Sequence, residues 1–278
     1  MLGQLGENAK FLAGGQSLIP LLKLRFANPE HLVDLNFIPS TSFIKEDAGA
    51  LHFGAMTRHA EIEHSALAKK IPVLHDCAAG IADVQVRNRG TIGGSLAEAD
   101  PSGDWANALI TLETTVHCLG PAGARAVHLS DFIKDAYTTV LAHDELVTAV
   151  EVKIPPQGSG GAYLAFKRTA PVYPSASVAV QLSVAGDVCQ NAAIALGCVG
   201  LTAIRATDAE TALRGKNLDD KTIASAAEAA RAAADPQPDI RGSAEYKRQL
   251  IVALVKRAIQ IAARRARGEQ VEGTHLYA

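Results

Sequence analysis

Two glycine pairs, each closing on Ser-Leu, constrain what this chain can fold into more than any other feature of its sequence. Residues 11–20 read FLAGGQSLIP and residues 91–96 read TIGGSL, and each pair follows a strand-like apolar stretch. Glycine lets the backbone adopt conformations closed to other residues and brings its N–H groups close to a ligand without steric hindrance. We therefore predict two backbone loops that are able to bind phosphate oxygens.

A helix is predicted directly after the first pair, over residues 17–26, with Ser17 as its N-cap. The free N–H groups and the positive dipole end of that helix would lie beside residues 14–17 and add a second attraction for an anion. In the second loop, the hydroxyls of Thr91 and Ser95 are able to donate as well. Two such loops could hold a diphosphate from opposite sides, which suggests a dinucleotide with a long reach, such as FAD.

Neither glycine pair is decisive alone, because most Gly-Gly pairs form tight turns without a ligand. The sequence holds no G-x-x-x-x-G-K-[ST] and no G-x-G-x-x-G between a strand and a helix, which argues against a P-loop or Rossmann site. Ser17 and Ser95 belong to no G-x-S-x-G elbow and to no S-x-x-K motif, so they are not predicted to be hydrolytic nucleophiles.

Composition argues against several classes of function. Lys and Arg number 27 against 29 Asp and Glu, and the net charge of -2 gives no reason to expect a nucleic-acid partner. The four cysteines form no C-x-x-C and the nine histidines form no H-x-x-H, so no metal site or iron–sulfur cluster is predicted on this chain. Reduced thiols, and the lack of an apolar stretch long enough for a bilayer, lead us to expect a cytoplasmic protein.

The segment PPQGSGG, residues 155–161, is the predicted domain boundary, because neither a helix nor a central strand tolerates that much proline and glycine. Before it, short helical and strand-like stretches alternate along the chain. After it, three strands with period-two alternation precede only helical material, which indicates an α+β unit. The basic end of the last helix, RRAR at residues 264–267, is interpreted as a solvated terminus that complements the helix dipole.

Four segments, in order along the chain, carry a family resemblance. They are LAGGQSLIPLLKLR near the start, FGAMTRHAEIE, VRNRGTIGGSLAEADPSGDW, and SAEYKRQLIVALVKRAI near the end. In these segments the chain resembles the FAD-binding medium subunit of the molybdenum hydroxylases, the xanthine dehydrogenase and aerobic carbon monoxide dehydrogenase family. The similarity runs from about residue 5 to about residue 265 and follows the family's order.

The resemblance implies an α+β protein with two domains. Residues 1–155 would form an FAD-binding domain of the vanillyl-alcohol-oxidase (PCMH) type, made of two α/β subdomains. Residues 162–267 would form a smaller α+β domain with antiparallel strands, similar to the CO dehydrogenase flavoprotein C-terminal domain. Members of the family normally have an additional strand and helix before the position that matches residue 5, so we expect this chain to be truncated at its N-terminus, which would expose a sheet edge.

The resemblance also implies which residues bind FAD, without a covalent link. The two loops would clasp the FAD diphosphate, and one acidic residue would contact its adenosine side. These residues are Ala13, Gly14, Gly15, Gln16, Ser17, Thr91, Ile92, Gly93, Gly94, Ser95 and Asp104. From the pattern alone, Asp104 is equally the N-cap of a helix that begins at Trp105. No catalytic residue and no metal ligand is implied, and we expect Glu98, where many relatives have histidine, to point away from the phosphates.

As a function, the resemblance implies an electron-transfer subunit. A large partner subunit would carry a molybdenum–pterin centre (molybdopterin) and a small partner two [2Fe-2S] clusters, and this chain would pass their electrons from FAD to quinone, NAD or oxygen. A heterohexamer with two copies of each of the three subunits is implied. Two alternatives stay open: a standalone flavin oxidoreductase, and a noncatalytic assembly subunit that has lost FAD.

Overall fold

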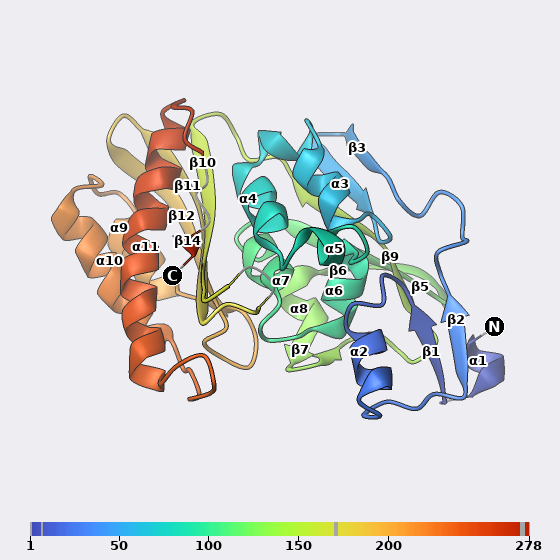
Figure 1. Cartoon of the computed structure of the whole chain (residues 1–278). Coiled ribbons are helices and arrows are strands. Elements are labelled where there is room, and N and C mark those ends of the chain that lie inside the picture. Colours follow the sequence, from blue (N-terminus) through green and yellow to red (C-terminus); the bar gives the residue numbers. More distant parts are fainter. Residues whose placement is uncertain (1, 7, 170–171, 273–275, 278) are drawn as a thin grey trace.

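A five-stranded antiparallel sheet forms the centre of the N-terminal half (Figure 1). The computed structural model describes residues 2–6, 8–169, 172–272 and 276–277. In order across the sheet, the strands are β3 (Ile44–Asp47), β4 (Ala50–Gly54), β9 (Leu146–Lys153), β5 (Thr114–Gly120) and β6 (Gly123–His128). Strand β9 pairs with both β4 and β5, so a segment far along the chain lies at the centre of this sheet.

Short helices cover one face of this sheet and enclose the first hydrophobic core. Val150 and Val152 of β9 are fully buried while Glu151 between them is not, as the alternation in the sequence predicts. Trp105 is the largest side chain buried in this core. The helices are α3 (His59–His64), η1 (Ala68–Lys70), α4 (Pro72–Gly80), α5 (Val84–Arg87), α6 (Ile92–Glu98), α7 (Asp104–Leu109) and α8 (Leu129–Phe132), and a small hairpin of β7 (Ile133–Asp135) and β8 (Thr138–Thr139) follows α8.

A second, smaller sheet near the N-terminus contains the parallel strands β1 (Ala9–Leu12) and β2 (His31–Asp34), with α1 (Leu2–Leu5) before them. Helix α2 (Leu18–Lys23) connects the two strands. The prediction of a helix over residues 17–26 with Ser17 as its N-cap was right at the start, because Ser17 is the N-cap residue of α2, although its side chain makes no capping hydrogen bond. It was wrong at the other end, because α2 ends at Lys23. Arg25 has a left-handed φ of 59°, which ends the helical run.

The C-terminal half is built on three long antiparallel strands, β10 (Ser159–Lys167), β11 (Ala176–Ala185) and β12 (Val188–Gly197). Two short strands complete the sheet, which has the order β13-β12-β11-β10-β14. Three helices follow β12 in the chain, and Figure 1 shows them beside one face of this sheet. These remaining elements are β13 (Ile204–Arg205), β14 (Leu276–Tyr277), α9 (Thr207–Leu213), α10 (Asp220–Ala233) and α11 (Ala244–Ala266).

The long strands of the C-terminal sheet separate two cores. Along β11, Val178 and Val180 belong to the core under α9, α10 and α11, while Ala179 between them belongs to the first core. Tyr163 of β10 also belongs to the first core. Because successive side chains of a strand point to opposite faces, the same strands contribute to both cores. The two halves of the molecule therefore share this sheet as a common wall.

The linker is shorter than the predicted segment PPQGSGG, because β10 already begins at Ser159. Gly160 is needed inside the strand for packing, since a Cβ at this position would lie 2.1 Å from the carbonyl oxygen of Ala262 in α11. The long helix can therefore lie directly against the strand.

The interpretation of residues 264–267 as a solvated terminus was wrong for one residue. The side chain of Arg265 is buried, and its Nη1 donates a hydrogen bond to Oδ2 of Asp76 in α4 at 2.5 Å. Arg264 lies at the surface, where it pairs with Glu269. The sequence shows a basic cluster, but only the contacts of Arg265 with Asp76 in α4 and with Gly161 in β10 show which of its members is buried.

Candidate functional site

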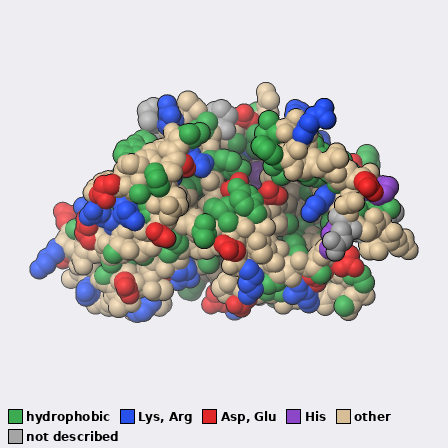
Figure 2. All heavy atoms as spheres, turned by 90° about the horizontal axis from the view of Figure 1, so that it is seen from below, with side chains coloured by type: hydrophobic (Ala, Val, Ile, Leu, Met, Phe, Trp, Pro, Cys, Tyr) green, Lys and Arg blue, Asp and Glu red, His purple; other side chains and the backbone are tan. Residues whose placement is uncertain are grey.

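A cavity of about 620 Å³ lies among β1, the two glycine pairs, the segment that leads into β9, and the first residues of the C-terminal half. Figure 2 shows the molecule from below, where its surface is hollowed and hydrophobic side chains gather beside the hollow. All but one of the predicted cofactor-binding residues line this cavity: Ala13, Gly14, Gly15, Gln16, Ser17, Thr91, Gly93, Gly94, Ser95 and Asp104. Ile92 is the exception, because its side chain is fully buried in the first core.

The two glycine segments meet at Gly14. A Cβ at Gly14 would lie 2.1 Å from the carbonyl oxygen of Arg89 and 2.8 Å from the Cα of Gly90. Gly15 has a φ of +76°, a left-handed conformation that side chains disfavour. Glycine is therefore required at position 15 by the turn and at position 14 by the close approach of the second segment.

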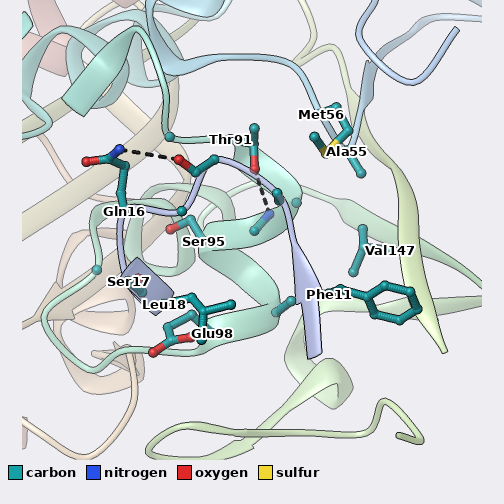
Figure 3. A pocket seen from close by; sticks show the side chains of 18 of the residues that line it. Phe11, Gln16, Ser17, Leu18, Ala55, Met56, Thr91, Ser95, Glu98 and Val147 are labelled. Carbon is teal, nitrogen blue, oxygen red and sulfur yellow. Dashed lines mark hydrogen bonds between the residues drawn. The ribbon is translucent and has the colours of Figure 1, made fainter. Parts of the chain in front are cut away.

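The turn after β1 has four consecutive main-chain N–H groups directed to no protein acceptor. Among the described residues, the amides of Gly14, Gly15, Gln16 and Ser17 donate to no backbone or side-chain oxygen. The side chain of Gln16 donates to the carbonyl oxygen of Gly14 at 3.3 Å, which closes the turn on its other side (Figure 3). Unused amides grouped in one turn beside a cavity form a site suited to an anion.

The second glycine pair lies inside a helix, which corrects the prediction of a loop. Thr91 is the N-cap of α6, and its Oγ1 accepts a hydrogen bond from the amide of Gly94 at 3.2 Å (Figure 3). The amide of Ile92 donates to Thr57 and that of Gly93 to Ala55. These amides therefore already donate to acceptors within the protein. Unlike the turn after β1, this segment does not offer them to a ligand.

Packing explains the second glycine pair. A Cβ at Gly93 would lie 2.5 Å from the Cβ of Ala55, so glycine lets α6 lie against the end of β4. A Cβ at Gly94 would lie 2.7 Å from Oγ1 of Thr91 and 3.5 Å from the Cβ of Ala13. The side chain of Ser95, in the same helix, also lines the cavity (Figure 3).

Arg58 ties the two segments together. Its guanidinium donates through Nη1 to the carbonyl oxygen of Arg89 and through Nη2 to Oδ1 of Asn36 at 2.5 Å. Asn36 in turn donates from Nδ2 to the carbonyl oxygen of Ala13 at 2.9 Å. Burial, and next the positive charge of Arg89, lower the pKa of Arg58 from its usual value. This chain of hydrogen bonds fixes the distance between the turn after β1 and the residues before α6.

Asp104 is the first residue of α7, and Gly103 is the N-cap. The alternative interpretation of Asp104 as the N-cap was therefore wrong by one residue. The carboxylate is buried and accepts a hydrogen bond from the hydroxyl of Tyr163 at 2.5 Å, across the boundary between the two halves. Burial, and next the charge of Asp104, raise the pKa of Tyr163 well above its usual value, which keeps this hydroxyl a proton donor.

Charged residues outside the predicted binding set also line the cavity, among them Lys167 and Glu98. Lys167, at the end of β10, is buried, and its Nζ donates to the carbonyl oxygen of Gly80. Glu98 lies at the cavity wall near Leu18 in Figure 3, and burial, and next the charge of Asp100, raise the pKa of its carboxyl group. Lys167 stands in a strand-like run far from either glycine pair, and its place in the cavity follows only from the tertiary fold.

His59 also lines the cavity, and it stands in the segment FGAMTRHAEIE. Its side chain is 5% exposed, and its Nδ1 accepts a hydrogen bond from Nε1 of Trp105 at 3.0 Å. Burial, and next the charges of Arg58 and Arg87, lower the pKa of His59 to about 3. The imidazole is therefore neutral at physiological pH. The segment was singled out for its resemblance, and no pattern in it assigns its histidine a role.

In the described part of the chain, no three His, Cys, Asp or Glu side chains come together as a group that could hold a metal ion. None of the described helices combines the length and the apolar composition that crossing a bilayer requires.

Comparison with known families assigns both halves of the chain. The family described as the FAD binding domain in molybdopterin dehydrogenase matches residues 1–156. The family described as the CO dehydrogenase flavoprotein C-terminal domain matches residues 161–262.

Similar proteins cover nearly the whole chain. The carbon monoxide dehydrogenase medium chain of Hydrogenophaga pseudoflava is 40% identical over 263 residues, which are 94% of this chain and 92% of that protein. A solved structure of carbon monoxide dehydrogenase from the same organism, one that lacks the Mo-pyranopterin moiety, superposes with a TM-score of 0.91 at 41% identity and covers 94% and 91% of the two chains. The structure of quinoline 2-oxidoreductase from Pseudomonas putida 86 superposes with a TM-score of 0.91 at 37% identity. The match covers 95% of this chain and 92% of that chain.

Fold and cavity together define an α+β flavoprotein with an FAD-binding domain of the PCMH type and an antiparallel C-terminal domain. The chain belongs to the family of FAD-binding medium subunits of the molybdenum hydroxylases, which includes the medium chain of carbon monoxide dehydrogenase and the FAD-binding subunit of xanthine dehydrogenase.

Proposed function

We propose that this chain is the FAD-binding electron-transfer subunit of a molybdenum hydroxylase, which passes electrons from the [2Fe-2S] clusters of a partner to an external acceptor. The observation that carries the proposal is the turn at residues 14–17, where four unused amides border a cavity large enough for a dinucleotide. The matches to the family over both halves of the chain support it.

The residues of the cavity fit FAD as a noncovalent ligand. The amides of Gly14, Gly15, Gln16 and Ser17 would donate to the diphosphate, and the hydroxyl of Ser95 would approach it from α6. The apolar lining residues Phe11, Leu141 and Val147 would exclude water from part of the cofactor.

The groups assigned here orient the cofactor and tune its surroundings. When bound, FAD supplies the redox chemistry, since its isoalloxazine ring takes up and releases electrons singly or in pairs. Lys167 and Asp104 are one buried cation and one buried acid that line the cavity. Their hydrogen bonds to Gly80 and Tyr163 hold both side chains in fixed positions.

The family suggests the partners. We propose that a large subunit with molybdopterin and a small subunit with two [2Fe-2S] clusters assemble with this chain into a cytoplasmic heterohexamer with two copies of each. The medium subunits named among the relatives support such an assembly. The hydroxylase substrate would then be selected by the large subunit, and this chain would interact with the final acceptor.

Absorption spectroscopy of the purified chain tests the proposal. Flavin absorption bands with no turnover by the chain alone, and with reduction once the partner subunits and a substrate are added, are the expected result. Turnover by the chain alone would favour a standalone flavin oxidoreductase. A folded protein that takes up no FAD would favour the assembly subunit and would contradict the proposal.

A further inference from the structure

His59 carries a hydrogen-bond donor that the protein itself does not use. Indole Nε1 can only donate, so the hydrogen bond of 3.0 Å from Trp105 requires Nδ1 of His59 to be the acceptor. In a neutral imidazole the proton then lies on Nε2. Among the residues that the structure describes, no acceptor pairs with this Nε2–H group.

Nε2 of His59 is open to the cavity although the ring is nearly buried. The side chain is 95% removed from solvent, as its exposed fraction of 5% shows, and it is one of the residues that line the cavity. The fully buried polar atoms without a partner, in the described part of the chain, belong to Asn107 and Gln181. Nε2 is not one of them, so a ligand in the cavity can reach it.

Gly90 packs against the ring of His59. A Cβ at residue 90 would lie 2.6 Å from Nε2 and 2.8 Å from Cδ2. Because these two distances are nearly equal, that place lies beside the bond between the two ring atoms and not in the direction in which the Nε2–H group points. The φ of Gly90 is not in the left-handed region, so its conformation does not demand glycine. Glycine at this position therefore lets the backbone lie against the imidazole.

The same place adjoins the unused amides of the first glycine turn. A Cβ at Gly14 would lie 2.8 Å from the Cα of Gly90, and a Cβ at Gly90 would lie 2.6 Å from Nε2 of His59. Gly90 therefore lies between the first glycine turn and His59, and residues 14–17, Gly90 and His59 all line the same cavity. The amides of Ile92, Gly93 and Gly94 add nothing there, because they are engaged within the protein.

We propose that His59 is a positioning residue for the cofactor, and that its Nε2–H group donates a hydrogen bond to a diphosphate oxygen of FAD from the side opposite the first glycine turn. The inference rests on the proposed function and extends it by assigning the second half of the diphosphate site to a side chain. Trp105 has a supporting role, because it fixes which ring nitrogen carries the proton.

Two amide substitutions separate the two nitrogens of the ring. In His59→Asn, the side-chain oxygen can replace Nδ1 as the acceptor for Trp105, but nothing reaches the place of Nε2. In His59→Gln, the longer side chain can place its NH₂ donor near Nε2, while the contact with Trp105 is lost. If His59 donates to the diphosphate, His59→Asn should bind FAD more weakly than His59→Gln. If His59 only accepts the hydrogen bond from Trp105, His59→Gln should lose more stability than His59→Asn.

The test is a titration of the full-length protein, stripped of flavin, with FAD and separately with ADP. Trp105 is the only tryptophan of the chain and lies one hydrogen bond from His59, so its fluorescence reports both folding and occupancy of the cavity. We expect His59→Asn to weaken FAD and ADP binding by the same factor, roughly ten- to a hundredfold, as for a lost hydrogen bond to a charged group. His59→Gln should stay within roughly threefold of the wild type.

Each remaining outcome is decisive. Equal affinity of His59→Asn and the wild type for FAD would overturn this inference and leave the proposed function intact, and so would a loss for FAD alone, which would place the contact on the flavin. A wild type that binds no FAD would overturn both. If His59→Asn does not fold, Gly90→Ala is measured instead, because its methyl group would lie 2.6 Å from Nε2 and would force the ring out of its position. Unchanged binding by a folded Gly90→Ala would also overturn the inference.

Discussion

Arg265 of α11 and Asp76 of α4 form an ion pair between the two halves of the molecule, with 2.5 Å between Nη1 and Oδ2 and with only 8% and 2% of the two side chains exposed. The same Nη1 donates to the carbonyl oxygen of Gly161, and Oδ2 of Asp76 also accepts from the amide of Tyr163. One buried pair therefore connects a helix of each half to the strand β10 between them.

Removal of one partner of this pair is expected to be severe. Arg265→Ala would leave the carboxylate of Asp76 buried without its cation, and we expect a loss of ~3–5 kcal/mol in the free energy of unfolding. Arg264→Ala is the matched control, because its exposed pair with Glu269 should contribute less than ~1 kcal/mol. Urea unfolding of the two variants measures the difference. Equal losses for both would contradict the structural role of Arg265.

Acid should weaken the same contact. Burial acts to raise the pKa of Asp76, but hydrogen bonds from His75 and Arg265, together with the charge of Arg265, bring it below its usual value. A carboxyl group whose pKa is lower in the folded than in the unfolded state stabilises the fold at pH values above its unfolded pKa, which is ~4 for Asp. That stability is lost as the pH falls through the folded value. We expect the free energy of unfolding, measured at decreasing pH from pH 6, to decrease once the pH is below ~4. Asp76→Asn should be less stable at pH 6, and its free energy of unfolding should depend less on pH in the acid range. An equally strong pH dependence in Asp76→Asn would exclude this carboxyl group as the cause.

Glu98 is expected to oppose the cofactor. Burial and Asp100 raise the pKa of its carboxyl group, because a charge in the cavity wall is unfavourable. As the pH rises through that pKa, the carboxylate forms and repels a diphosphate, so FAD should bind more tightly at low pH. Glu98→Gln should bind FAD a few-fold more tightly at pH 8, a gain of ~0.5–1 kcal/mol, with little change at the acid end. Glu113→Gln, an exposed carboxylate paired with Lys153, is the control. Weaker binding by Glu98→Gln would show that the carboxyl group contributes to the site.

The two glycine pairs should differ in their tolerance of a methyl group. Gly14→Ala would place a Cβ against the backbone of Arg89, which cannot move away without separating the two segments. We expect a loss of ~1–3 kcal/mol in stability and loss of FAD. Gly94→Ala meets chiefly the side-chain oxygen of Thr91, which can rotate, so the damage should be smaller. Thermal melts with and without FAD compare the two. A Gly94→Ala variant as damaged as Gly14→Ala would contradict this distinction.

The sequence predicted the parts of the fold that depend on local pattern. The alternation in β9 and the turn at Gly14 and Gly15 follow from period two and from the conformational freedom of glycine. The resemblance to the family supplied the two-domain architecture and the cofactor, and the comparisons confirm both.

The rest depends on contacts between distant residues. Gly-Gly is unfavourable in a helix, so the sequence predicted a loop where Ala55 and the Thr91 cap stabilise the first turn of α6. Arg265 looked like a surface residue, because its partner Asp76 lies 189 positions away. The cavity-lining positions of Lys167 and His59 likewise follow from pairings that no local window contains.

The wall formed by β10, β11 and β12 has a consequence for how this protein can be divided. Because alternate side chains of these strands complete the hydrophobic interior of the N-terminal half, a fragment that ends at residue 156 would leave Trp105 and its neighbours uncovered where Tyr163, Ala179 and Ala195 normally pack. The N-terminal half is then not a self-sufficient module. The ability to hold a flavin would be gained only when the last strands emerge from the ribosome and dock.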